Sequence, residues 1–367
     1  MTHYYRTGVY TKDYFNRLLQ AGTYFYKTCL AAGRLMKLNK NIKIFINYFL
    51  GPLLFIWLSW SIYREIKNQP DIETAWQKIG ESFSSPLLLN LVAVILLMIV
   101  NWSIEAVKWK ISVSEIQKVS FTKALRAVLS GVSFSVSTPN RVGEYLGRVL
   151  YMDDGNRLKT ISVTIVGSIS QLIVTIFMGI TGLVILRPYI QDEHVISSIW
   201  LSMIIYGGLG ALLVLTLFYF RLSWLIKWVD RLPAMKRFTY LVKVLEGFNA
   251  TLLLRILSLS LFRFIVFIIQ YYLLFRLFDV EVSWWQTFWS VSVSFLVMAA
   301  IPTFAIAELG LKGKVNLIFT GLFSANKAGI IFTTAGIWFI NLIIPAIIGS
   351  LMILSIKKIN TEKNEGT

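Results

Sequence analysis

Long apolar runs recur along this 367-residue sequence and decide what it can fold into. A helix needs roughly 20 apolar residues to cross about 30 Å of hydrocarbon. Six runs approach or exceed that length, near 44–63, 86–106, 160–186, 196–220, 252–275 and 329–356. Hydrophobic residues make up 56% of the chain and charged residues 15%, which is far from the balance of soluble domains. The sequence therefore predicts an all-α integral membrane protein with about six full transmembrane helices.

Basic residues gather between these runs and give the formal net charge of +17. They crowd the segment before residue 44, the stretches 108–126 and 221–243, and the tail after 356, whereas the loops near Asp192 and Asp279 hold few. By the positive-inside rule, we expect a multi-pass protein of the cell (inner) membrane with both termini in the cytoplasm. No nucleic-acid recognition motif accompanies the charge, so we expect an anionic membrane lipid as partner, and no nucleic acid.

Two further apolar segments, 119–150 and 285–316, are each interrupted by a proline with a glutamate a few residues later. The interruptions read STPNRVGEYLGR and IPTFAIAELGLKG. If either segment crossed the membrane completely, the charge asymmetry of the loops would fail. We therefore expect two re-entrant helical hairpins. With three full crossings in each half, about 37–190 and 191–356, the second half enters from the opposite face, which predicts an inverted repeat.

These segments form one expected membrane domain over residues 37–356. Residues 1–36 are polar, mixed and moderately basic, and Met36 begins a stretch that resembles a natural amino-terminus. We expect 1–36 to be a cytoplasmic extension that is dispensable or not native, and 357–367 to be a cytoplasmic tail.

The first interruption places anion-binding groups beside an expected helix start. Thr138 can cap a helix that begins at Pro139, where the missing N–H would be unpaired in any case. In that helix Arg141, Glu144 and Arg148 lie on one face. Free backbone amides and guanidinium groups together suit an anion, above all a phosphate.

The second interruption has a similar start at Pro302 and Thr303, with Glu308 and Lys312 on one helix face. The charges of the two interruptions are Arg141, Arg148 and Lys312 against Glu144 and Glu308. A lipid phosphodiester could neutralise the surplus positive charge. At about 2.5–3.5 kcal/mol each, five charges would not be left facing lipid. The alternative is that Glu144 with Arg148, and Glu308 with Lys312, are ion pairs that only pin the hairpins.

Polar residues inside the spans are weaker candidates. Asn101, Glu105 and Lys108 could line a cavity or lie at the membrane interface. The other intramembrane polar positions favour helix–helix hydrogen bonds over ligand binding, and they are Gln171, Arg263, Gln270 and Asn341. The two histidines lie far apart, Cys29 is the one cysteine, and no Walker A loop is present, so we expect no metal and no cofactor.

The element T-P-x-x-x-G-E-x-x-x-R at 138–148, followed by IPTFAIAELGLKG and NLIIPAIIGSL, resembles the lysylphosphatidylglycerol synthase transmembrane region, or flippase-like family. This family includes the membrane half of the multiple peptide resistance factor, and the resemblance covers about residues 37–356. It implies that the protein moves a phosphate-bearing lipid between leaflets, with the hairpins forming a central pocket. The positions that match the family pattern are Thr138, Pro139, Gly143, Glu144, Arg148, Pro302, Glu308 and Gly310.

The chain departs from the family in two ways. The second element reads PTFAIAE where family members are richer in glycine. Bifunctional members also carry a soluble synthase domain after the membrane part, whereas this sequence ends eleven residues after Ile356. We therefore expect a standalone member that does not aminoacylate lipid by itself.

The sequence leaves three functions open. The first is a flippase that moves a phospholipid or a polyprenyl-linked lipid and is not an enzyme. The second is a membrane-embedded lipid-modifying enzyme, which is disfavoured because no paired aspartates, metal-ligand cluster or nucleophile with a nearby base can be assembled. The third is a non-transporting partner of a separately encoded synthase or glycosyltransferase. The sequence predicts no oligomeric state.

Overall fold

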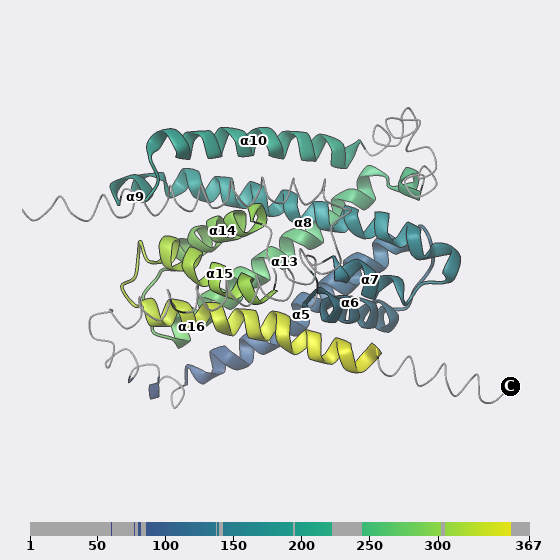
Figure 1. The fold of residues 1–367 in the computed structure, drawn as a ribbon, viewed down its shortest axis with the longest axis horizontal. Coiled ribbons are helices and arrows are strands. Elements are labelled where there is room, and N and C mark those ends of the chain that lie inside the picture. Colours follow the sequence, from purple (N-terminus) through teal and green to yellow (C-terminus); the bar gives the residue numbers. More distant parts are fainter. Residues whose placement is uncertain are drawn as a thin grey trace, which may run out of the picture.

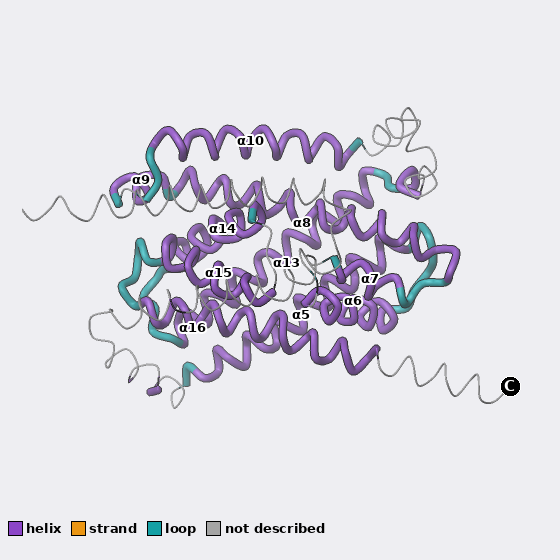
Figure 2. Tube along the Cα trace, viewed as in Figure 1, coloured by secondary structure: helices purple, strands orange, loops and turns teal. Residues whose placement is uncertain are grey.

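The structure is a computed structural model, and it describes Trp60, Gln77, 80–81, 86–136, Thr138, 142–193, 195–221, 244–301 and 305–353. These residues form ten α-helices and no strand (Figures 1 and 2). The helices are α5 (Leu88–Val113), α6 (Phe121–Val136), α7 (Gly143–Val149), α8 (Arg157–Ile185), α9 (Arg187–Asp192), α10 (Ser198–Phe220), α13 (Ala250–Leu277), α14 (Trp284–Ala300), α15 (Ala305–Thr320) and α16 (Lys327–Trp338). A π-helix at Phe339–Ile343 extends α16 into one long helix that ends at Ile353.

Five of the described helices are long and apolar enough to cross a membrane, and each overlaps a predicted run. They are α5, α8, α10, α13 and the helix Lys327–Ile353. Five of the six predicted runs are thus confirmed as helices of spanning length, and the protein is a multi-pass membrane protein. The sixth run, 44–63, lies outside the described residues. Helix α5 continues seven residues past its predicted end, so Lys108 belongs to the span and not to a basic loop.

The helix ends are fixed by local sequence signals. The Asn249 side chain accepts a hydrogen bond of 2.8 Å from the Leu252 N–H at the start of α13. At the start of α14, Ser283 and Gln286 form a reciprocal capping box. Both arrangements satisfy backbone donors that a helix start leaves unpaired, which matters most where water is scarce.

Helix α13 lies at the centre and packs against α5, α8, α14 and α16. Most of the connecting loops gather at two opposite ends of the molecule (Figure 2). One end, called here the 321–326 end, also holds the loop 278–283. The other, called here the 114–120 end, also holds 150–156. Helices α6 and α7 lie toward the 114–120 end, and α14 and α15 toward the 321–326 end (Figure 1).

Helices α6 and α7 occupy the first interrupted segment and pack tightly on each other. Two glycines allow this approach, because a Cβ added to Gly147 would lie 2.5 Å from the Cα of Gly131. The described helix α7 begins at Gly143, and the expected helix start at Pro139 stays a prediction. Pro139 and Arg141 themselves lie outside the described residues. The start of α7 lies against α6, and glycine at position 143 permits this, because a Cβ there would collide with the Phe134 carbonyl.

Helices α14 and α15 occupy the second interrupted segment and also pack on each other. Helix α14 lies along α8, where Gly179 faces Leu296 and Gly182 faces Val293. Small residues at such contacts let membrane helices approach closely, which is a main source of packing energy where lipid is as apolar as the side chains. Pro302 and Thr303 lie outside the described residues, so the expected helix start there stays a prediction.

Candidate functional site: a buried ion-pair network beside a cavity

Helix α5 presents three polar side chains to the interior of the molecule. Asn101, Glu105 and Lys108 are spaced i, i+4 and i+7, so they lie on one face of the helix. Each is at most 3% exposed. These side chains therefore lie inside the helix bundle and not on its surface.

Glu105 makes ion pairs with three cations from three helices. Its Oε2 atom lies 2.7 Å from Lys108 Nζ and 2.6 Å from Arg263 Nη1, and its Oε1 atom lies 2.9 Å from Arg148 Nη2. One carboxylate thus connects α5, α7 and α13. Burying a charge is costly unless it is paired and hydrogen-bonded, and here both oxygens of the carboxylate are used.

Arg148 belongs to two ion pairs at once. Besides Glu105, it donates to Glu144 one helical turn earlier on α7, and this is the i,i+4 pair expected from the sequence. Arg148 is 3% exposed, whereas the Glu144 side chain is 25% exposed. We call Glu105, Lys108, Glu144, Arg148 and Arg263 the Glu105 network.

Lys108 fixes the network to the neighbouring spans. Its Nζ atom lies 3.4 Å from the Gly167 carbonyl oxygen on α8 and 3.5 Å from Ser260 Oγ on α13. Ser260 Oγ lies 2.7 Å from Ser170 Oγ. The lysine therefore serves as a structural anchor, with its charge directed to Glu105 and its remaining donors to helix–helix contacts.

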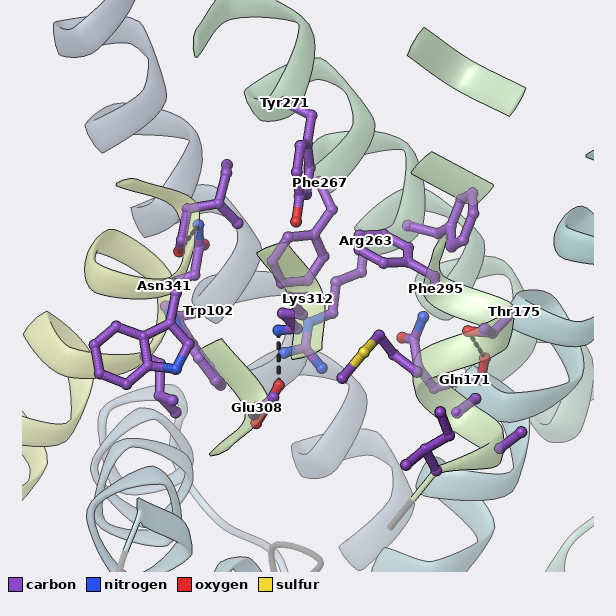
Figure 3. A pocket seen from close by; sticks show the side chains of 18 residues that line it. Trp102, Gln171, Thr175, Arg263, Phe267, Tyr271, Phe295, Glu308, Lys312 and Asn341 are labelled. Atoms are coloured by element: carbon purple, nitrogen blue, oxygen red, sulfur yellow. Dashed lines mark hydrogen bonds and ion pairs between the residues drawn. The ribbon is translucent and has the colours of Figure 1, made fainter. Parts of the chain in front are cut away.

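Arg263 links the network to a cavity of about 560 Å³ (Figure 3). Its guanidinium lies over the Trp102 ring at 4.9 Å and the Phe267 ring at 5.7 Å, which are cation–π distances. Its Nε atom donates to Asn101 Oδ1 at 2.6 Å. These contacts hold the guanidinium in one orientation at the cavity wall.

A second ion pair lines the same cavity. Lys312 Nζ lies 2.7 Å from Glu308 Oε1 on α15, and Figure 3 shows Arg263 extending toward this pair. Among the described residues of the wall, Arg263, Lys312 and Glu308 leave one net positive charge. The rest of the wall includes the aromatic rings of Trp102, Phe264, Phe267, Tyr271, Phe295 and Trp338.

The structure brings some of the predicted site residues to the cavity and leaves others at a distance. Glu308 and Lys312 line the wall, whereas Glu144 and Arg148 reach it only through Glu105 and Arg263. Gly310 is buried within α15. The remaining predicted residues outside the described part are Pro139, Arg141, Pro302 and Thr303.

Thr138 joins the two helices of the first interruption. Its Oγ1 atom accepts a hydrogen bond of 2.7 Å from the N–H of Gly143, the first residue of α7, and donates at 3.2 Å to the Phe134 carbonyl in α6. Thr138 thus satisfies a backbone donor at the start of α7 from five residues upstream.

Sequence reasoning undervalued two residues, Glu105 and Arg263. The sequence alone favours helix–helix hydrogen bonding for Arg263, and it leaves Glu105 open between the membrane interface and a cavity. The available signal was that an arginine near the middle of a span, as Arg263 is, needs a partner, and that an acid on another span is the obvious one. The pairing itself, across 158 residues of chain, cannot be read from spacing.

Fold and site together define a multi-pass helical membrane protein with a charged, aromatic-lined cavity in its interior. Comparison with family models identifies it further, because residues 48–349 match the lysylphosphatidylglycerol synthase TM region. The chain belongs to this family. No synthase domain is detected in the sequence. A search of curated proteins gives no match.

Proposed function

We propose that this protein moves a phosphate-bearing lipid, either a phospholipid or a polyprenyl-linked lipid, between the two leaflets of the membrane. The observation that supports this most strongly is the cavity wall, where Arg263 and Lys312 outnumber Glu308. A phosphodiester carries one negative charge and would neutralise that surplus. Guanidinium and ammonium groups are also the donors that phosphate oxygens prefer.

The Glu105 network supports the same proposal from the opposite side of the wall. The described network and the Glu308–Lys312 pair hold four cations, Lys108, Arg148, Arg263 and Lys312, against three carboxylates, Glu105, Glu144 and Glu308. A set of ion pairs that served only to pin helices would be expected to balance. We assign the surplus positive charge to Arg263, because Arg263 is the one residue of the Glu105 network that also lines the described cavity wall.

In this proposal, α6 with α7 and α14 with α15 are re-entrant hairpins that approach the cavity from opposite faces of the membrane. Their positions toward opposite ends of the molecule favour this arrangement (Figure 1). The two halves of the domain 37–356 then form an inverted repeat with both termini in the cytoplasm. Arg141, Pro139, Pro302 and Thr303 complete the headgroup path in the proposal.

The protein carries out no bond-making chemistry in this account, which agrees with a family match confined to the membrane region. A separately encoded lipid-modifying enzyme would supply or consume the lipid. The headgroup would bind at Arg263 and Lys312 while the acyl chains stay in lipid. Glu105 and Glu308 would hold the two cations in place between cycles.

Leaflet-resolved labelling in reconstituted vesicles tests the proposal. Vesicles with the full chain receive acyl-labelled phosphatidylglycerol, and a membrane-impermeant quencher reports the label in the outer leaflet. We expect the native chain to equilibrate the label, and Arg263→Ala, Arg148→Ala and Glu144→Gln to do so more slowly. Arg255→Ala is the matched control, since Arg255 is an exposed arginine on the same helix.

The same vesicles separate the three candidate functions. Equal exchange rates in the native chain and all variants would contradict the transport role of these residues. An enzyme would instead change the chemical identity of the labelled lipid, which chromatography detects. A protein that only anchors a partner enzyme would give no exchange and no new lipid.

A further inference from the structure

A line of polar side chains runs along α15 from the cavity toward the 321–326 end. Glu308, Lys312, Asn316 and Thr320 follow one another at intervals of four residues, so each lies roughly one helical turn above the last. Twelve residues of helix rise about 18 Å. The first two side chains line the cavity, whereas Asn316 is 1% exposed and Thr320 is fully buried.

The neighbouring helices present polar groups to this line. Asn316 Nδ2 donates to Thr334 Oγ1 at 3.0 Å on α16 and to Tyr271 Oη at 3.4 Å on α13. One turn further on, Thr320 Oγ1 donates to Ser290 Oγ on α14 at 3.4 Å. Tyr271 also lines the cavity, so the polar groups extend from the cavity into the interface of four helices. We call these seven side chains, from Glu308 to Thr320 with Tyr271, Ser290 and Thr334, the α15 polar line.

Two buried oxygens beside this line have no donor among the residues that the structure describes. They are Asn316 Oδ1 and, in the first turn of α14 next to the 278–283 loop, Thr287 Oγ1. An unsatisfied buried acceptor costs about 1–3 kcal/mol, and buried water is the usual remedy in proteins. Serine and threonine by themselves are explained by helix packing. The two unsatisfied acceptors, at the middle and the outer end of the line, instead favour a row of water molecules along it.

We propose that the α15 polar line conducts protons between the 321–326 end and Glu308, and that a proton on Glu308 accompanies the anionic headgroup through the cavity. This rests on the proposed function. Hydronium at the outer end transfers a proton through water to a Glu308 oxygen, which forms the neutral acid and leaves water behind. Lys312 then loses its counter-charge, and the charge of the cavity wall rises from one to two.

The charges around Glu308 support this consequence. Lys312 faces it on α15, and Arg263 and Tyr271 face the cavity from α13. Helix α14 contains no ionisable side chain. Helix α16 contains only Lys327 at its start, and α6 contains Lys123 and Arg126 in its first two turns. The described helices that pack on α15 therefore hold no second carboxylate, and the nearest one beyond them, Glu105 on α5, lies behind Arg263.

Protonation of Glu308 and binding of an anion strengthen each other, because each favours the cavity charge that the other requires. Coupling between two binding events is reciprocal, so a proton gradient can drive the lipid. One proton with one monoanionic headgroup is electrically neutral overall. A pH difference of about one unit can then sustain up to about a tenfold ratio of lipid between leaflets.

The test uses the full chain in phosphatidylcholine vesicles with a trace of acyl-labelled phosphatidylglycerol, and with the membrane potential clamped by potassium and valinomycin. With acid outside, we expect the native chain to accumulate label in the inner leaflet. An even distribution with and without the gradient would overturn the coupling and leave the proposed function intact. Label that never moves would overturn both.

Variants of the α15 polar line provide the second part of this vesicle test. Asn316→Leu and Thr320→Val should lose gradient-driven accumulation but keep one-for-one exchange at equal pH, because exchange does not require the proton to leave. Asn316→Ser replaces the amide with a hydroxyl, which still donates and accepts a hydrogen bond, and should keep the gradient response. Thr164→Val is the control, since Thr164 is a buried hydrogen-bonded threonine on α8 away from the line. Native accumulation in Asn316→Leu would show that protons do not use this line.

Discussion

Arg263 Nη1 donates to Glu105 Oε2 at 2.6 Å, and this bond joins the ion-pair network inside the bundle to the wall of the cavity. Through it, the Glu144–Arg148 pair is linked to the cavity wall that also holds the Glu308–Lys312 pair. Because of this bond, a change in charge at the cavity wall alters ion pairs that join α5, α7 and α13. The relationship makes Glu105 the residue on which the stability of the site depends most.

Replacing Glu105 with glutamine should destabilise the protein strongly. The substitution keeps the shape of the side chain but leaves three buried cations, Lys108, Arg148 and Arg263, with one carboxylate fewer. Breaking a buried pair on one side costs about 3–5 kcal/mol. Thermal unfolding of the purified protein in detergent micelles should show a clear fall in the midpoint.

The matched control for this prediction is Glu115→Gln. Glu115 is an exposed glutamate just beyond the end of α5. Its replacement should change the free energy of unfolding by no more than about 0.5 kcal/mol. If both variants unfold at the same temperature as the native chain, the Glu105 network contributes nothing to stability.

Gly147→Ala should disturb the contact between α6 and α7. The added methyl group would lie 2.5 Å from Gly131 backbone atoms, which cannot move without shifting a helix. Overpacking of this kind costs about 1–3 kcal/mol. Gly210→Ala on α10 meets open space and removes a flexible glycine from a helix, so it should be neutral or stabilising by up to about 1 kcal/mol. The order of the two unfolding midpoints tests the packing, and a reversed order would contradict it.

Lys312→Ala should slow lipid exchange because it removes one of the two cations among the described residues of the cavity wall. A hydrogen bond to a charged group contributes about 1.5–3 kcal/mol, which corresponds to a loss of about tenfold or more. Lys312→Arg keeps the charge and should retain most of the rate. Exchange rates from leaflet-resolved labelling decide the matter, and equal losses in both variants would show that charge is not what the position supplies.

Asn101→Leu should slow exchange without touching the lipid. Asn101 Oδ1 accepts the 2.6 Å hydrogen bond from Arg263 Nε, so it orients the guanidinium from behind the wall. As a positioning residue, it should affect phosphate-bearing lipid and leave the low exchange of a phosphate-free glycolipid unchanged. A parallel loss for both lipids would indicate a general structural defect instead.

The spans could be predicted from the sequence because hydrocarbon thickness fixes the length of an apolar helix. The boundaries were less certain, since a charged residue need not end a span. Lys108 shows this, because its partner Glu105 lies one turn away and keeps the charge inside. Counting it as loop charge therefore misplaced a residue of the Glu105 network.

The local pairs were also predictable, because Glu144 with Arg148 and Glu308 with Lys312 stand four residues apart on their helices. The cavity could not be predicted in this way, since it depends on contacts between α5 and α13. The residues that meet there are more than 150 positions apart in the chain. Spacing reveals neighbours within one helix, whereas tertiary packing decides which helices share a face. Arg263 belongs to the second kind, and its role emerges only from the fold.

The most direct test of the central claim compares two acyl-labelled lipids in vesicles that contain the native chain. One is phosphatidylglycerol, and the other is glucosylceramide, whose headgroup has no phosphate. If Arg263 and Lys312 receive a phosphate in the cavity, the initial exchange rate of phosphatidylglycerol should exceed that of glucosylceramide. Arg263→Ala should remove that difference. Equal rates for both lipids in the native chain, or a difference that survives Arg263→Ala, would contradict the account.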